Sequence, residues 1–204
     1  MAFYSRVIFP RLCDLLLDRP VVAKLRRALL AHAHGNILEI GFGTGLNLPC
    51  YPAHVRTICT VDPNPGMHAL AKRRIRRSQV MVEHHQLSSE QLPFKDATFD
   101  CVVSTFTVCS IENPRQALAE VHRVLKAGGC LLFIEHGLSP ELAIQKWQHR
   151  LDGLEQRFAD GCHLNRNMPE LIRASGFASV KTDAFYLKGL PKTHGYLYRG
   201  IATK

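Results

Sequence analysis

The sequence predicts an α/β fold with a largely parallel sheet, and three observations lead to this prediction. First, Ile37, Leu38 and Ile40 form a β-prone apolar run that breaks at Gly41, as a buried strand ending in a tight turn does. Second, further apolar runs of strand length lie at 56–61, 80–84, 100–104 and 130–134. Third, segments with helical spacing of apolar residues alternate with these runs, which is typical of a parallel sheet covered by helices.

The composition favours one domain. With 204 residues, of which 46% are hydrophobic, the chain is long enough for one well-packed core and too short for two comfortable ones. We therefore expect a single domain over 1–204, with a helical cap at 1–34 and a core at 35–204. The seven cysteines are odd in number and include no C-x-x-C pair, which favours buried, reduced thiols in a cytoplasmic protein.

The N-terminal segment predicts two helices and no targeting signal. Apolar residues spaced three and four apart favour an amphipathic helix at 3–17, in spite of Pro10, and a second helix at 21–33. Packing on the sheet and covering a ligand site are alternative roles for these helices. Charged residues, among them Arg6 and Arg11, interrupt the first apolar stretch, which argues against a signal peptide or a membrane span.

The chain is basic, since Lys and Arg number 26 while Asp and Glu number 17. The densest basic cluster, 72–77, has no aromatic residues interleaved with it. The sequence thus offers no stacking platform for single-stranded nucleic acid, and no nucleic-acid partner is expected. A well-solvated cytosolic surface explains the surplus charge. A weak peripheral contact with anionic lipid, helped by the apolar N-terminus, is the alternative.

A glycine-rich loop follows the first strand. Gly41, Gly43 and Gly45 lack a Cβ atom, so the backbone can take positive φ and a ligand can approach its amides closely. The loop does not match the dinucleotide pattern G-x-G-x-x-G, because its third glycine would stand where the chain has Leu46. A glycine turn of another α/β protein is the alternative on this stretch alone.

An acid ends the second strand. Asp62 follows Gly41 by about twenty residues, a position from which a carboxylate can accept hydrogen bonds from both ribose hydroxyls of a nucleoside. An N-cap of the helix that starts near Pro65 is the alternative role. The glycine loop and Asp62 together are a more specific signal than either alone.

These residues carry a resemblance to a known family. The spacing E-x-G-x-G-x-G from Glu39 to Gly45 resembles motif I of the class I S-adenosylmethionine-dependent methyltransferases, and VDPNPGM at 61–67 resembles their motif II. LPF at 92–94 and VLKAGG at 124–129 are similar to further stretches of methyltransferase type 11 domains. The resemblance implies a Rossmann-like, doubly wound sheet of seven strands, mostly parallel, with one antiparallel strand near the C-terminus and N-terminal helices over the cofactor site.

The resemblance also implies the cofactor S-adenosylmethionine, with S-adenosylhomocysteine as product. In this family the loop passes under the methionine part of the cofactor, and the acid at Glu39 helps to order the loop and the ammonium group. The implied cofactor-binding residues are Glu39, Gly41, Gly43, Gly45, Asn47, Asp62, Pro63, Asn64, Met67, Ser88, Ser89, Glu90 and Thr105. Ser88 is a departure, since the family usually has an aspartate there. Adenine contacts then fall to Ser88, Ser89 or Glu90.

Local strings narrow the resemblance to a subgroup. YSRV near the start, TFTVCSIEN after the fourth strand, EHG after the fifth, WQHRLD and DGCHLNRN together resemble the thiol S-methyltransferases and their bacterial relatives. The larger group also holds ubiquinone and menaquinone C-methyltransferases. Animal thiol methyltransferases begin with a hydrophobic membrane anchor, and this chain starts after the point where that anchor would end. The resemblance therefore does not imply membrane association.

The resemblance implies a small-molecule acceptor, and the subgroup favours a thiol sulfur. Methyl transfer from a sulfonium is an in-line displacement, so the protein mainly aligns the nucleophile and excludes water. His136 and His163 are the candidate catalytic residues, since an imidazole could raise the thiolate fraction; a structural or exposed histidine is the alternative for each. Cys109, Trp147 and Cys162 are the candidate substrate-pocket residues, and Trp147 is also expected to pack its helix onto the sheet.

Other interpretations stay open at this point. The same fold could methylate a quinone ring carbon or a phospholipid amine, or the chain could bind the cofactor without turnover. No metal is expected, because Cys162 and His163 alone do not supply three or four ligands at a recognisable spacing. The oligomeric state is not predicted.

Overall fold

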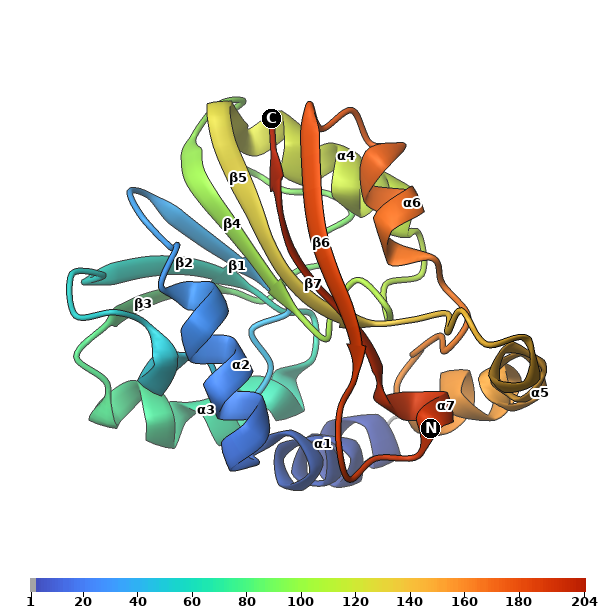
Figure 1. Cartoon of the computed structure of the whole chain (residues 1–204). Helices are drawn as coiled ribbons and strands as arrows, with labels where there is room; N and C mark the ends of the chain where they lie inside the picture. Colours follow the sequence, from blue (N-terminus) through green and yellow to red (C-terminus); the bar gives the residue numbers. More distant parts are fainter. Residues whose placement is uncertain (1–2) are drawn as a thin grey trace.

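A sheet of seven strands forms the centre of the molecule in the computed structural model, which describes residues 3–204 (Figure 1). The strands are β1 (Ile37–Ile40), β2 (Thr57–Val61), β3 (Met81–His85), β4 (Phe99–Thr105), β5 (Leu125–His136), β6 (Ser179–Tyr186) and β7 (Tyr196–Thr203). Their order is β3-β2-β1-β4-β5-β7-β6. Strand β7 runs in the direction opposite to the other six, so its pairs with β5 and β6 are antiparallel and all other pairs are parallel. The predicted seven-stranded sheet with one antiparallel strand near the C-terminus is confirmed. Residues 1 and 2 of the predicted cap lie outside the described residues.

Helices cover both faces of this sheet and the end to which its parallel strands point. They are η1 (Tyr4–Ile8, a π-helix), α1 (Phe9–Leu17), α2 (Pro20–Leu30), α3 (Pro65–Arg77), α4 (Pro114–Val124), α5 (Leu142–Phe158), α6 (Met168–Arg173) and α7 (Lys192–Gly195). Apolar residues of α2 and α3 pack in one core cluster with Ile37 of β1. Those of α4 and α6 pack in a second cluster with Leu38, the next residue along. Successive side chains of β1 point to opposite faces of the sheet and therefore pack in two different cores.

Two stretches beside the strands are irregular. After the glycine loop the chain forms only a short 3₁₀ turn, η2 (Leu48–Cys50), whose second residue is Pro49. The strand expected at 130–134 is longer in the structure, because β5 starts at Leu125 and includes Gly128 and Gly129. Gly128 takes a φ of +77° there, and the pairing between β4 and β5 shifts register over this stretch. The glycines thus form an irregularity within a longer strand.

The expectation that Trp147 packs α5 onto the sheet is wrong, because its side chain is 54% exposed. The buried residues of α5 are polar instead: Gln148 and Asp152. Gln148 donates to the carbonyl oxygens of Gly137 and Thr193 and accepts from the backbone N–H of Ser139. The inner side of α5 is therefore attached through hydrogen bonds, and periodicity alone did not reveal which side faces inward.

The N-terminal helix α1 lies at the end of the sheet to which the parallel strands point (Figure 1). Arg74 of α3 pairs with Asp14 at 2.7 Å and with Asp18 at 2.9 Å, and it also donates to the carbonyl oxygen of Thr44 in the glycine loop. These contacts attach α1 to α3 and to the glycine loop at once. Within residues 3–204, no helix is both long enough and apolar enough to cross a membrane.

A buried polar network lies beneath the glycine loop. Arg26 of α2 donates to Asn47 Oδ1 and to Thr105 Oγ1, both at 2.7 Å. Asn47 in turn donates to Glu39 Oε1 at 2.9 Å, and the Tyr51 hydroxyl donates to Glu39 Oε2 at 2.7 Å. Burial raises the pKa of Glu39 to about 7, although these hydrogen bonds and the charge of Arg26 oppose the shift. The network joins α2, β1, β4 and the loop.

We predict that Gly66→Ala loosens η1 from α3, because a Cβ atom on Gly66 would overlap the carbonyl oxygen of Arg6. Limited trypsin digestion should then cut sooner after Arg6 and Arg11 than in the wild type. Gly153→Ala is the matched control, since Gly153 is also helical and its added Cβ meets no atom within 4 Å. We expect the control to keep the wild-type cleavage rate and to gain up to about 1 kcal/mol of stability. Equal cleavage of both variants would contradict the role of this contact.

We predict that Glu39→Gln changes how stability depends on pH. The raised pKa of Glu39 means that the folded protein holds this proton more tightly than the unfolded chain. The tighter proton binding stabilises the folded protein fully below pH 4.5, the ordinary pKa of a glutamate. This stabilisation is lost as the pH rises to about 7. At about 1.4 kcal/mol per pKa unit, the wild type should lose about 3 kcal/mol through this group. Urea unfolding at several pH values measures this, and a wild-type minus variant difference that stays constant with pH would contradict it.

Candidate functional site

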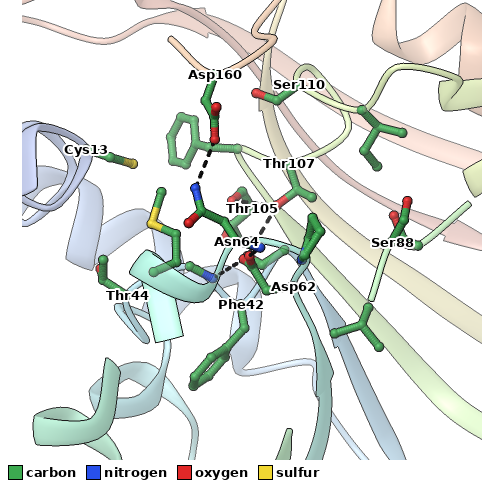
Figure 2. A pocket seen from close by; sticks show the side chains of 18 of the residues that line it. Cys13, Phe42, Thr44, Asp62, Asn64, Ser88, Thr105, Thr107, Ser110 and Asp160 are labelled. Atoms are coloured by element: carbon green, nitrogen blue, oxygen red, sulfur yellow. Dashed lines mark hydrogen bonds between the residues drawn. The ribbon is translucent and has the colours of Figure 1, made fainter. Parts of the chain in front are cut away.

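A cavity of about 340 Å³ opens at the carboxyl ends of the central strands, beneath α1. In open α/β sheets this edge is where ligands bind, and the volume is in the range of small-molecule sites. Its walls come from the glycine loop, the residues after β2, β3 and β4, and the N-terminal helices. Figure 2 shows Asp62 and Asn64 in the middle, Cys13 on one side, and Ser88 and Ser110 on the other.

The glycine loop takes a backbone course that other residues would not follow. Gly41 has a φ of +64° and Gly43 a φ of +57°. A Cβ atom on Gly41 would overlap the side chain of Thr107, whereas one on Gly43 would approach only the Gly41 carbonyl oxygen, at 3.9 Å. Gly41 is thus needed for close packing against the loop after β4, and Gly43 leaves free space on the cavity side.

Asp62 is held by the backbone on both of its oxygens. Its Oδ2 accepts from the Gly43 N–H at 2.7 Å, and its Oδ1 accepts from the Asn64 N–H at 2.8 Å. The side chain lines the cavity but is 94% buried, since only 6% is exposed. Burial raises the pKa of Asp62, and the two N–H donors work against that rise. Each oxygen keeps further lone-pair capacity for a ligand.

Asp62 is not the N-cap of α3. That role belongs to Asn64, whose side-chain oxygen accepts from the Gly66 N–H at 2.9 Å. The Asn64 amide also donates to Asp160 at 3.1 Å (Figure 2). Ser5 of η1 donates to the other oxygen of Asp160 at 2.7 Å. Segment η1, the start of α3 and the loop after α5, which are far apart in the sequence, therefore meet close to Asp62.

Arg26 is a site residue that the sequence analysis missed. It lines the cavity, is 4% exposed, and its Nε atom is buried without a partner among residues 3–204. Its guanidinium lies 5.4 Å from the ring centre of Phe106. A signal was present, because Arg26 stands on the same helical stripe as Val22, Leu29 and Leu30. A charge on a buried stripe indicates a polar partner or a ligand.

One face of α1 and the loop after α5 also contribute residues that we had not predicted. Phe9, Cys13 and Leu17 follow each other at intervals of four and all line the cavity, as does Asp160. The predicted helical spacing was the signal for α1, but it did not say what the face covers. The loop position of Asp160 could not be placed from local sequence.

The loop after β4 is shaped by a buried acid at the end of β5. Glu135 is fully buried and accepts from the backbone N–H groups of Thr107 and Cys109 and from the hydroxyl of Ser104. Phe106 takes a φ of +57° at the start of this loop. Glu135 thereby fixes the turn that carries Thr105, Thr107 and Ser110 along the cavity wall.

The structure brings most of the predicted cofactor residues together. Those that line the cavity are Gly41, Gly43, Asp62, Pro63, Asn64, Met67, Ser88, Ser89, Glu90 and Thr105. Glu39, Gly45 and Asn47 are not in its lining. Glu39 and Asn47 belong instead to the polar network that supports the loop from below. The Ser88 hydroxyl donates a hydrogen bond to Glu90 Oε2 at 3.3 Å, and Glu90 Oε1 accepts one from the Asn113 N–H.

The predicted catalytic and substrate residues lie outside the cavity lining. Trp147 is on the outer side of α5, with the guanidinium of Arg150 5.2 Å from its ring centre. His163 Nδ1 lies 3.1 Å from Asp152 Oδ2 and 3.2 Å from Gln156 Nε2. Cys109, His136 and Cys162 lie together behind the wall that Ser110 forms, and His136 Nε2 is 2.7 Å from Cys162 Sγ.

Comparisons with known proteins agree with this arrangement. A family model described as a methyltransferase domain matches residues 38–133. Thiol S-methyltransferase TMT1B from Rattus norvegicus is 35% identical in an alignment over 153 residues, and the match covers 72% of this chain and 62% of that protein. Phosphatidylethanolamine N-methyltransferase from Cereibacter sphaeroides is 34% identical in an alignment over 116 residues, and the match covers 54% of this chain and 57% of that protein. The chain thus spans less than two thirds of these relatives.

The fold is shared more widely than the sequence. A crystal structure of a methyltransferase from Thermotoga maritima, described as dependent on S-adenosylmethionine and as a possible histamine N-methyltransferase, has a TM-score of 0.69 at 21% identity. The match covers 99% of this chain and 98% of that one. The matched segment 38–133 contains the glycine loop, Asp62 and the loop after β4, so the motifs, the family model and the fold agree. Residues 38–133 of this chain therefore match a methyltransferase domain, and the chain has the fold of the S-adenosylmethionine-dependent methyltransferase from Thermotoga maritima.

Proposed function

We propose that this chain binds S-adenosylmethionine in the cavity beneath α1 and transfers the methyl group to the sulfur of a small thiol. The observation that carries the cofactor half is Asp62, whose two oxygens are each fixed by one backbone N–H and keep lone-pair capacity for the two ribose hydroxyls. The thiol half is supported by the rat relative, which is named a thiol S-methyltransferase.

We assign the remaining lining residues to the two parts of the cofactor. Met67, Ser88, Ser89 and Glu90 would contact the adenine, and the glycine loop, Thr105 and Arg26 would hold the methionine part. Arg26 fits this role because its buried Nε atom lacks a partner among the described residues, and a carboxylate would satisfy it.

Glu39 lies behind the residues that line the cavity. It does not line the cavity, and its two oxygens accept from Asn47 and Tyr51. We infer that it positions the loop through Asn47, together with Gly45, and does not itself contact the cofactor. Removal of the acid would then change the cavity by way of the loop.

The bound cofactor supplies a methyl group on a positively charged sulfur, which a nucleophile can attack in line. The residues of this chain bind, orient and exclude water. Phe9, Cys13 and Leu17 of α1 close the cavity with apolar side chains, and the loop after β4 forms the wall beyond Thr105. A small thiol needs little further activation, since a pKa near 8.5 leaves a few per cent thiolate at neutral pH.

No histidine of the described residues lines the cavity. His136 is engaged with Cys162, and His163 is engaged with Asp152. We therefore assign alignment and the apolar enclosure, and not general-base catalysis, as the main contribution of the protein. A phospholipid amine is the second candidate acceptor, because the Cereibacter sphaeroides relative is named for that substrate.

We predict that Asp62→Ala weakens S-adenosylmethionine binding by about 1–3 kcal/mol, because two ribose hydroxyls lose their acceptor. Isothermal titration calorimetry measures the affinity directly. Asp183→Ala is the matched control, since Asp183 is an exposed acid of β6 that pairs with Arg199 and is not in the cavity lining. Unchanged affinity in Asp62→Ala would refute the ribose role.

We predict that labelled methyl from S-adenosylmethionine enters an alkyl thiol when the protein is offered that thiol, a demethylated quinone and phosphatidylethanolamine vesicles. Asp62→Ala should lower the rate, and Asp183→Ala should not. Label found only in the quinone or in the lipid would refute the thiol half of the proposal. Cofactor binding without label in any product would refute methyl transfer to these acceptors and favour a binding role.

A further inference from the structure

Three side chains that are common metal ligands meet behind the cavity wall. Cys109 lies in the loop after β4, His136 ends β5, and Cys162 lies in the loop after α5. The two sulfur atoms and a ring nitrogen of the histidine all lie within 4.8 Å of one another. The function proposed above uses none of the three.

We propose that Cys109, His136 and Cys162 bind a thiophilic divalent cation such as Zn²⁺. The two Sγ atoms are 3.5 Å apart. Two thiolates on tetrahedral zinc are separated by about 3.8 Å, given Zn–S bonds of about 2.3 Å. His136 Nε2 lies 2.7 Å from Cys162 Sγ, and it has to move by roughly 0.9 Å to reach the sulfur–nitrogen separation of about 3.6 Å around such a cation.

The charges of the cluster suit a buried cation. Cys109 is 1% exposed and Cys162 is 6% exposed, so an uncompensated charge would be costly there. One divalent cation with two thiolates and a neutral imidazole has no net charge. Soft sulfur ligands and an imidazole favour zinc over magnesium or calcium, which prefer oxygen. Three protein ligands leave the fourth tetrahedral position to water.

The backbone holds these ligands in place without a metal. The His163 N–H donates to the Cys109 carbonyl oxygen at 2.9 Å, which joins the two loops that carry the cysteines. The Leu164 N–H donates to Asp152 at 2.8 Å and fixes the second loop on α5, while Glu135 accepts from the Cys109 N–H. A site that is arranged before binding loses less entropy when the cation enters.

Other thiols in the described part of the chain are arranged differently. Cys101 and Cys130 are register partners on β4 and β5, and no histidine or carboxylate completes a ligand group with them. Cys59, Glu83 and His85 form a second group, but the Glu83 side chain is 69% exposed and already pairs with His85 at 3.1 Å. The buried group is therefore the better soft-metal site, and the surface group is a control.

The position of the site gives it a structural consequence. Ser110, next to Cys109, and Asp160, two residues before Cys162, both line the cavity. Ser110 Oγ lies 3.7 Å from Cys109 Sγ. A cation on this cluster would cross-link the two loops that carry these residues and would fix that part of the wall.

Cobalt titration tests the proposal on the untagged, reduced, metal-free full chain. We expect one equivalent of Co²⁺ to give the visible absorption of tetrahedral, thiolate-ligated cobalt, which aqueous cobalt lacks, and Zn²⁺ to abolish it. Cys162→Ser and Cys109→Ser should each lose this absorption. Cys59→Ser and Cys50→Ser should keep it, since Cys59 belongs to the surface group and Cys50 is a buried thiol outside both groups.

A second measurement needs no variant. Zinc-edge X-ray absorption of the wild type with one equivalent of Zn²⁺ should show two sulfur neighbours at about 2.3 Å and nitrogen or oxygen at about 2.0–2.1 Å. Absence of the cobalt spectrum, or a zinc shell of nitrogen and oxygen only, would overturn the proposal. Loss of the cobalt spectrum in Cys59→Ser, with retention in Cys162→Ser, would also overturn it, as would a Cys109–Cys162 disulfide that forms in place of metal binding.

Discussion

The buried contact of Arg26 with Asn47 and Thr105 is the constraint on which the arrangement of the cavity depends. Asn47 transmits this contact to Glu39, so the guanidinium of α2 and the carboxyl group of β1 are joined through an amide. A charged pair in the interior is stable only when its remaining hydrogen-bonding capacity is also satisfied. Here Asn47 of the loop and Thr105 accept from one guanidinium nitrogen of Arg26 and are thereby placed at the edge of the cavity, while Arg26 Nε keeps no partner among the described residues.

Asp62 and Glu135 also hold loops at the edge of the cavity, as Glu39 does for the glycine loop. Each is a buried carboxylate at the carboxyl end of a strand, and each accepts from backbone N–H groups of a neighbouring loop. Loops carry unpaired N–H groups that must find acceptors when they are buried. The three acids Glu39, Asp62 and Glu135 therefore hold three consecutive loops along the sheet edge in fixed conformations.

Sequence reasoning succeeded where the signal is local. The glycine spacing and Asp62 lie within one strand–loop–strand unit, β1 to β2, and the alternation of strands and helices along the chain predicts the sheet. It failed where chain segments that are far apart meet. Arg26 reaches a site built by other elements, and Cys109, His136 and Cys162 are spaced by 27 and 26 residues, so no short motif joins them. Trp147 was misplaced because α5 faces inward with Gln148 and Asp152, which a search for apolar periodicity does not recognise.

The polar inner side of α5 has a consequence for the energetics of the domain. A helix attached by hydrogen bonds such as those of Gln148 contributes little hydrophobic free energy, whereas α2 and α4 bury apolar side chains in the two cores. Local unfolding that exposes little apolar surface has a low free energy. Helix α5 can therefore open locally while the two apolar cores keep the sheet intact.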